Sequence, residues 1–284
     1  MFCAFLYNVV RVTHPRGQCL RRACILQNRR FIGKTIQSGT IEDRCMANNR
    51  RHFIIATVLI VICTVLVYWV LDTVLLKPAA AVVEAGPIDN LFDQHIWLIA
   101  FLFALVVVFM CYALIVFRAR GDEGDGEYVH GNGLLEILWT VVPCFVVVYF
   151  AWISTTMLID LTRPNPDEYV ISAEGRQWSW LFTYPETGAV TPDLVLPVDT
   201  PIRMDLTSDD VLHSFWVPEF RVKQDTVPGM VTHVRFNPNV IGEYTLRCAE
   251  LCGTNHGGML ATVRVVSAEE FRLWQSEQLA QRQE

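Results

Sequence analysis

The residues most able to do chemistry lie near the carboxy-terminal end of the chain. Cys248 and Cys252 are four positions apart, and His256 and Met259 follow within the same glycine-containing segment. His213 stands 35 positions before Cys248, at the end of a β-rich stretch. Thiolates, imidazoles and thioethers are soft or borderline ligands that suit copper. This pattern therefore predicts a copper site.

The number of cysteines indicates more than one copper atom. A blue-copper site uses two histidines, one cysteine and a weak axial methionine, and this segment carries that set plus a second cysteine. The second thiolate allows two coppers bridged by two sulfurs, each copper keeping one imidazole. Met259 and a backbone carbonyl then serve as weak outer ligands. Such a rigid, shared site changes little on reduction, so it suits electron relay rather than substrate binding.

Two other uses of the cysteine pair fit less well. Structural zinc sites usually show Cys-x2-Cys spacing, and methionine is not a zinc ligand. A redox disulfide is usually a Cys-x2-Cys pair at the start of a helix, which Gly253, Gly257 and Gly258 disfavour here. Taken singly, Met259 fits a core residue and His213 a structural one. Together with the cysteines they favour copper.

The composition separates a membrane region from one soluble domain. The chain has 284 residues, of which 52% are hydrophobic and 18% charged, against about 25% charged in average soluble domains. The apolar surplus falls in three runs, each near the roughly 20 residues that a membrane-spanning helix needs. Only two of nine cysteines lie after these runs, which excludes a disulfide-stapled scaffold. The chain carries nothing that suggests binding to nucleic acid.

The apolar runs and their flanks define the expected segments. Residues 1–52 are a basic leader or follow a misassigned start, with Met46 as the alternative to Met1. Residues 53–76 are a signal anchor or an extra transmembrane helix, and the alanines at 79–81 leave open a cleaved signal. We expect an external linker over 77–95, membrane helices over 96–117 and 134–160, and a cytoplasmic loop over 118–133. Basic flanks at Arg50, Arg51, Arg118 and Arg120 place the soluble domain outside.

The remainder alternates short β-rich stretches with turn signals, which is typical of a sandwich or barrel. The predicted strands are 169–173, 177–184, 202–207, 230–236, 243–248 and 260–266. A helix over 267–284 opens with a capping box formed by Ser267 and Glu270. Thirteen acidic and seven basic residues between 165 and 266 favour a basic partner, or give the mild acidity common to soluble domains.

From about Ile96 onwards the chain resembles subunit II of cytochrome c oxidase. The resemblance rests on Cys248-x3-Cys252-x3-His256-x2-Met259 with Asp210-Val-Leu-His213 upstream. It implies a membrane α-helical anchor, with two core transmembrane helices plus an extra N-terminal one, followed by an all-β cupredoxin-like Greek-key domain over 165–266. It also implies a binuclear CuA centre, bridged by the cysteines and ligated by the histidines. The family pattern makes Met259 the weak axial ligand and Glu250 the carbonyl ligand, whose side chain also reaches a magnesium ion shared with subunit I.

Two further motifs match the family. The segment from Gln177 to Trp180 resembles its aromatic motif, which makes Trp178 the point where electrons enter, although Arg176 and Ser179 replace the usual His and Tyr. By composition alone, Trp178 fits a buried aromatic strand. The analogy places Asp209, Asp210 and Asp225 on the docking face, although they also fit ordinary solvated charges.

The segment from His130 to Pro143 resembles the start of the family's second membrane helix. There the residue matching Glu136 lies at the mouth of a proton channel of subunit I. Without the resemblance, Glu136 is an acid that the helix dipole favours in a first turn.

The resemblance implies the electron-accepting subunit of a terminal oxidase. A soluble cytochrome c or a small blue-copper protein docks on the acidic face, and electrons pass to haem in subunit I, where oxygen reduction drives proton pumping. Subunits I and III and membrane lipid are the expected partners. No Cys-x-x-Cys-His sequence for a fused haem follows. The bacterial plasma membrane is favoured over the mitochondrial inner membrane.

One alternative is a membrane-anchored copper-delivery protein, which is thioredoxin-like and needs a βαβ pattern around the cysteine pair. A quinol-oxidase subunit lacks the copper ligands that are present here.

Overall fold

The computed structural model describes residues 39–75, 77–116, 118 and 131–281. Most of the basic leader lies outside these described residues. The chain forms two units, described separately below. The helical unit comprises the described parts of Met1–Leu76 and Gln94–Val148, and the β unit comprises Lys77–Asp93 and the described part of Tyr149–Glu284.

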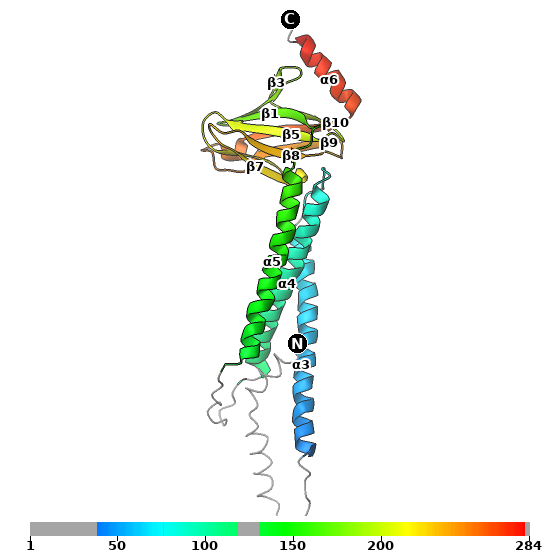
Figure 1. Ribbon diagram of the computed structural model, residues 1–284, viewed down its shortest axis with the longest axis vertical. Coiled ribbons are helices and arrows are strands. Elements are labelled where there is room, and N and C mark those ends of the chain that lie inside the picture. Colours follow the sequence, from blue (N-terminus) through cyan, green and yellow to red (C-terminus); the bar gives the residue numbers. More distant parts are fainter. Residues whose placement is uncertain (1–38, 76, 117, 119–130, 282–284) are drawn as a thin grey trace, which may run out of the picture. The chain divides into compact units, whose positions relative to one another are not determined.

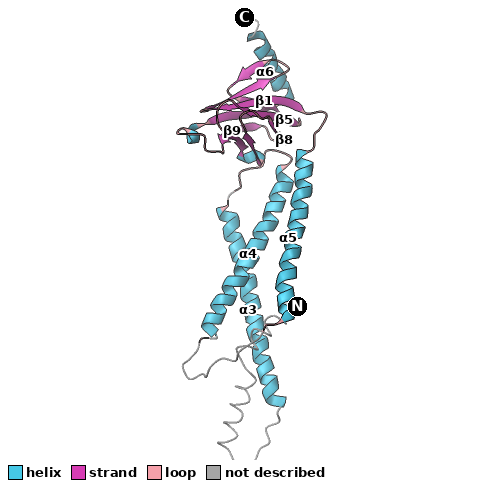
Figure 2. Ribbon diagram, turned by 60° about the vertical axis from the view of Figure 1, so that its left-hand side comes forward, coloured by secondary structure: helices cyan, strands magenta, loops and turns pink. Residues whose placement is uncertain are grey.

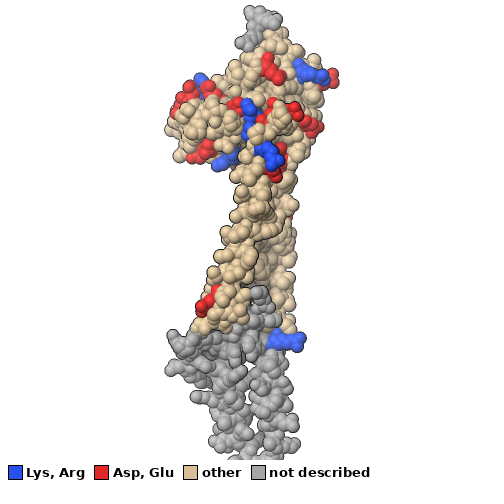
Figure 3. Space-filling model, in the orientation of Figure 1, with Lys and Arg blue, Asp and Glu red and all other residues tan. Residues whose placement is uncertain are grey.

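Three long helices precede the sheets: α3 (Gly39–Val74), α4 (Ala85–Val116) and α5 (Gly133–Thr162) (Figure 1). Stretches of 25, 32 and 30 residues in them are long and apolar enough to cross a membrane. Helix α5 buries none of its side chains, and large apolar residues are exposed along all three helices. Figure 3 shows the contrast with the β unit, over which the charged side chains gather. A helix that is apolar on every face fits a lipid environment.

Helix α3 packs directly against α4. Tyr68 stacks on Trp97 with ring centroids 3.9 Å apart, and His52 Nδ1 lies 2.7 Å from the Tyr112 hydroxyl. The two helices cross in Figure 2. Among the described side chains of the helical unit, the buried residues of both helices repeat every four positions. They are Ala56, Ile60 and Thr64 on α3 and Ile96, Ala100 and Ala104 on α4. Small residues at this spacing let membrane helices approach closely.

The β unit consists of two five-stranded sheets (Figures 1 and 2). The first has the order β3-β2-β1-β5-β8, with β1 Tyr169–Arg176, β2 Ser179–Tyr184, β3 Ala189–Thr191, β5 Ile202–Ser208 and β8 Thr232–Phe236. The second has the order β4-β10-β9-β6-β7, with β4 Leu194–Pro197, β6 His213–Val217, β7 Val222–Thr226, β9 Gly242–Cys248 and β10 Leu260–Val266. The pairs β1–β5 and β4–β10 are parallel and the other pairs antiparallel.

The core forms because alternate residues point inward. Strand β5 buries Ile202, Met204 and Leu206 and leaves the residues between them partly exposed. Large side chains fill the core, among them Trp180, Phe182, Tyr184, Phe215, Phe220 and Phe236. The helix α6 (Ala268–Gln281) starts with the Glu270 N–H donating to Ser267 Oγ. The predicted helical anchor followed by an all-β cupredoxin-like Greek-key domain is therefore confirmed.

The segment Lys77–Asp93 is part of the β unit. Ala81, Val82 and Ala85 are buried in its core, and Val82 forms a β-bridge with Pro238. The Arg221 guanidinium donates to both Asp89 carboxylate oxygens, at 2.8 and 3.1 Å, and to the Pro78 carbonyl at 2.6 Å. Helix α4 begins inside the span expected to be a linker, where Gly86-Pro87 suits a helix start. We call Lys77–Asp93 the strap.

Candidate metal centre

Pairing of β6 with β9 brings the distant histidine to the cysteine loop. Strand β6 begins at His213 and β9 ends at Cys248, and Phe215 lies opposite Cys248 in the antiparallel register. The Ala249 N–H then donates to the Ser214 carbonyl. The loop closes where the Cys248 N–H donates to the Met259 carbonyl, after a 3₁₀ turn over His256–Gly258. The strand pairing thus brings the side chains of His213 and Cys248, which are 35 positions apart in the chain, into direct contact.

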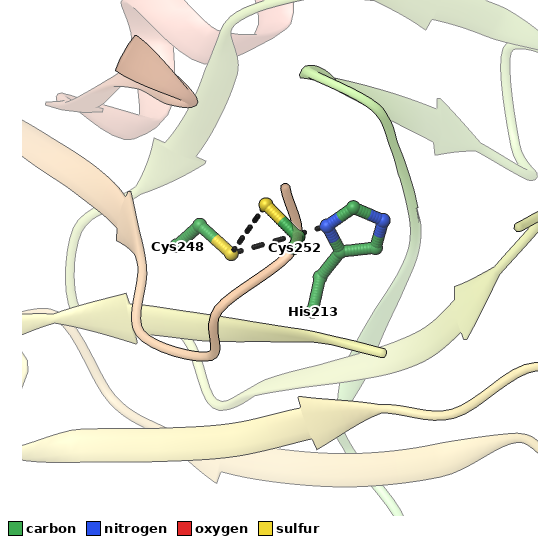
Figure 4. Close-up of side chains that lie close together, drawn as sticks. All are labelled: His213, Cys248 and Cys252. Atoms are coloured by element: carbon green, nitrogen blue, oxygen red, sulfur yellow. Dashed lines mark hydrogen bonds between the residues drawn. The ribbon is translucent and has the colours of Figure 1, made fainter. Parts of the chain in front are cut away.

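Three buried side chains converge at this point. Figure 4 shows His213, Cys248 and Cys252 pointing toward one another. The sulfurs are 3.7 Å apart, and His213 Nδ1 lies 3.9 Å from Cys248 Sγ. A disulfide would need about 2.05 Å between the sulfurs. Donor atoms that each lie about 2.0–2.3 Å from one ion fall within ~4.6 Å of each other. These three residues therefore form a group that could hold a metal ion.

Further donors surround the second sulfur. His256 Nδ1 lies 3.6 Å from Cys252 Sγ, and Met259 Sδ lies 3.7 Å from it. The Cys248 thiol lies 3.2 Å from the Glu250 carbonyl oxygen. Each sulfur consequently has an imidazole of its own, and all six residues singled out in the sequence as metal ligands lie together.

Burial at this site affects the pKa of the Cys252 thiol. His213 and Met259 are fully buried, and both cysteines are nearly so. Burial, with Cys248 alongside, raises the pKa of the Cys252 thiol well above its usual range. Burial therefore favours the protonated form of the Cys252 thiol. A bound cation would stabilise the thiolate and displace the proton.

A hydrogen-bonded chain links the histidine to the cysteine loop. His213 Nε2 lies 2.8 Å from Asp210 Oδ1, and Asp210 Oδ2 accepts from the Gln177 backbone N–H at 2.7 Å. The Gln177 side chain donates to the Cys252 carbonyl at 2.7 Å. Burial raises the pKa of Asp210, but hydrogen bonds from His213 and from two backbone N–H groups outweigh it and lower that pKa to about 2.

Trp178 lies against the cysteine loop at Gly253. A Cβ at Gly253 would lie 2.9 Å from Gln177 Nε2 and 3.3 Å from Trp178 Nε1, and the residue has a φ of +121°. Only glycine therefore fits between Cys252 and the indole without strain. Trp178 is 37% exposed, so the ring reaches from the loop to the surface.

The remaining predicted residues lie elsewhere. Glu136 is exposed in the first turn of α5, in the helical unit, where Asn132 Oδ1 accepts from the Leu135 N–H. The Glu250 side chain is partly exposed beside its carbonyl. Asp209 is open to solvent and pairs with Arg176, whereas the Asp210 carboxylate is bound within the site. These roles of Asp210 and Gln177 were not predicted from the sequence, where the available signal was an acid three residues before a candidate ligand histidine.

Comparison with known proteins is consistent with this site. The family described as cytochrome C oxidase subunit II, transmembrane domain, matches residues 74–157, and its periplasmic domain matches residues 187–266. The chain is 31% identical to cytochrome c oxidase subunit 2 of Synechocystis sp. over 262 residues, covering 75% of this chain and 79% of the relative. It is 32% identical to the Thermostichus vulcanus subunit 2 over 274 residues, covering 78% and 84%.

Among solved structures, the periplasmic domain of cytochrome oxidase subunit II from Bradyrhizobium japonicum is 30% identical, with a TM-score of 0.39, covering 41% of this chain and 97% of that one. The two matches thus belong to one family: its transmembrane domain matches the part of the chain that holds α4 and most of α5, and its periplasmic domain matches residues 187–266, which hold the histidine–cysteine group. The chain belongs to the cytochrome c oxidase subunit II family and is a membrane-anchored subunit of that enzyme, with its soluble domain outside the membrane.

Proposed function

We propose that this subunit holds a binuclear copper centre that receives electrons from an external one-electron carrier. Cys248 and Cys252 would bridge the metals, and His213 and His256 would each ligate one. Met259 and the Glu250 carbonyl would be weak outer ligands. The observation that carries the proposal is the pair of unbonded sulfurs, 3.7 Å apart, each with its own imidazole.

The donor set distinguishes among metals. A one-copper site of the blue type needs a single thiolate and would leave one buried cysteine without a role. Zinc would accept the cysteines and histidines, but it gains nothing from the buried Met259 sulfur. Copper supplies a one-electron couple when bound. The residues themselves keep water out and fix the donors on a closed loop.

Trp178 is the proposed point where electrons enter the site. Its indole touches the loop at Gly253, directly after Cys252, and its outer edge is exposed. A carrier bound over this ring would lie one residue from a proposed copper ligand. Asp209 and Glu174, which both pair with Arg176 two positions before Trp178 in the chain, would offer carboxylates to a basic carrier. The carrier would be a soluble cytochrome c or a small blue-copper protein.

The proposal extends to the wider assembly by analogy with the family. Haem-bearing subunit I would receive the electrons, reduce oxygen and pump protons, with subunit III as a further partner. Glu136 would serve at the mouth of a proton channel, consistent with a carboxylate at the edge of a membrane helix. The partly exposed Glu250 side chain would contribute to a magnesium site shared with subunit I. The proposed location is the bacterial plasma membrane.

The alternative of a copper-delivery protein has little support. A thioredoxin-like chaperone needs a helix that starts at its cysteine pair. The described residues between β1 and β10 contain only strands, loops and two 3₁₀ turns.

Two tryptophans with equal exposure provide a test of the electron-entry role. Trp178 and Trp216 are each 37% exposed, but only Trp178 touches Gly253. In the purified oxidase, Trp178→Phe should slow oxidation of the reduced carrier at least about tenfold, because the electronic contact is lost, while Trp216→Phe should leave the rate near wild type. Equal rates for both variants contradict the proposal.

A further inference from the structure

We infer that Asp210 and Gln177 form a brace that positions the ligand His213 and the electron-accepting Trp178 against the loop of Cys252. This inference rests on the proposed copper centre. It assigns Asp210 to positioning within the site, where the resemblance had suggested carrier docking. We call the two residues the Asp210–Gln177 brace.

The first half of the brace orients His213. Asp210 Oδ1 lies 2.8 Å from His213 Nε2, while His213 Nδ1 lies 3.9 Å from Cys248 Sγ on the opposite edge of the ring. An Nε2–H that donates to the carboxylate leaves the Nδ1 lone pair directed at the thiol side, which is the tautomer a metal ligand needs. The Val211 N–H also donates to Oδ1 at 2.6 Å, so this oxygen is held on two sides.

The second half fixes the segment that carries Trp178. Asp210 Oδ2 accepts from the Gln177 backbone N–H, and Gln177 Nε2 donates to the Cys252 carbonyl, both at 2.7 Å. Trp178 follows directly along the chain and packs on Gly253. The brace therefore joins three loops, those before β2, before β6 and after β9. A single carboxylate orients the histidine and anchors the tryptophan segment.

Asp209 provides an internal contrast with Asp210. The Asp209 side chain is 65% exposed and lies near Arg176, whereas that of Asp210 is 31% exposed with both oxygens engaged. An exposed acid attracts a basic carrier through long-range forces that salt screens. A carboxylate that holds a ligand acts on the metal site itself, and salt does not remove that effect.

The test uses the assembled oxidase with Asp210→Asn and the matched control Asp209→Asn. The measurements are the visible, near-infrared and electron paramagnetic resonance spectra of copper, its reduction potential, and carrier oxidation at low and high salt. Asp210→Asn should change the spectra and the potential and lower the oxidation rate about tenfold at both salt concentrations. Asp209→Asn should leave the copper signals unchanged and raise the carrier KM only at low salt.

The inference is overturned if Asp210→Asn leaves the copper signals as in wild type and changes only the salt-dependent KM. If Asp210→Asn does not assemble, Gln177→Leu decides, because it keeps the backbone donor to Asp210 and loses only the bond to Cys252. Unchanged spectra and rate in Gln177→Leu also overturn it. If the wild-type oxidase itself lacks a copper pair, the proposed function is contradicted, whatever the variants show.

Discussion

The cysteine loop and the membrane helices differ in how far contacts within the chain bury and fix their side chains. In the loop, buried donors are fixed by contacts within the chain: His213 by Asp210, Cys252 by Gln177, and the loop ends by a backbone hydrogen bond. Along the helices, large apolar side chains are exposed and α5 buries none. The donors of the candidate metal site therefore all come from this chain, whereas the helices present surfaces suited to lipid and other subunits.

Removing a donor from the loop should have the largest effect. Cys252→Ser deletes one proposed bridge, so the copper pair should be lost and carrier oxidation should fall more than about a hundredfold, because losing even a residue that only supports a ligand costs about 10–100-fold. Cys144→Ser is the matched control, since this thiol is exposed on α5. Copper content and carrier oxidation of the purified oxidase measure both variants. Normal rates in Cys252→Ser contradict the electron-relay role.

A smaller change to the same loop should act through Trp178 and Gln177. Gly253→Ala introduces a Cβ 2.9 Å from Gln177 Nε2 at a φ of +121°. We expect a loss of about 1–3 kcal/mol of unfolding free energy and slower carrier oxidation. Gly257→Ala meets open space and should change neither quantity. Thermal unfolding and carrier oxidation check the pair, and equal behaviour of the two variants argues against a close Trp178 contact.

The strap, whose last residues form the first turns of α4, is expected to stabilise the β unit. Arg221→Met removes three hydrogen bonds to Asp89 and Pro78 of the strap, together with one to the Pro218 carbonyl, and leaves a partly buried carboxylate unpaired. We expect a destabilisation of about 2 kcal/mol. Arg264→Met breaks an exposed pair with Glu270 and should cost less than about 0.5 kcal/mol. Unfolding of the purified chain in denaturant measures the difference, and an equal loss for both variants would rule out a stabilising strap.

The smallest effect on the metal site should come from the helical unit. Glu136→Gln changes an exposed side chain in the first turn of α5. If it serves a proton channel, proton uptake by the oxidase should slow while the copper spectrum stays constant. Proton uptake and optical spectra of the same preparation test this. An altered copper spectrum would show that the two regions are not independent.

The sequence could predict which candidate ligands lie together better than it could predict their surroundings. Cys248, Cys252, His256 and Met259 are close in the chain, so their spacing alone indicates a common site. His213 was selected by its residue type and its place after a β-rich stretch, but the β6–β9 pairing that brings it to the loop has no local signal in the sequence. Strand β6 was missed because it is a short, continuously buried run apart from Trp216, which lacks the alternation that marks a half-buried strand.

The strap and the brace show why the rest could not be predicted. Arg221 and Asp89 are 132 positions apart, and Gln177 and Cys252 are 75 apart. Polar contacts over such separations leave no periodic pattern, because they depend on how the loops meet in the folded domain. The strap accordingly looked like a linker, and Asp210 looked like a surface acid.

The most direct test of the central claim is a count of metal atoms in the purified subunit after growth with both copper and zinc. Two thiolates and two imidazoles in this arrangement should retain two copper atoms per chain and exclude zinc. A single copper atom per chain, or a preference for zinc, would contradict the account.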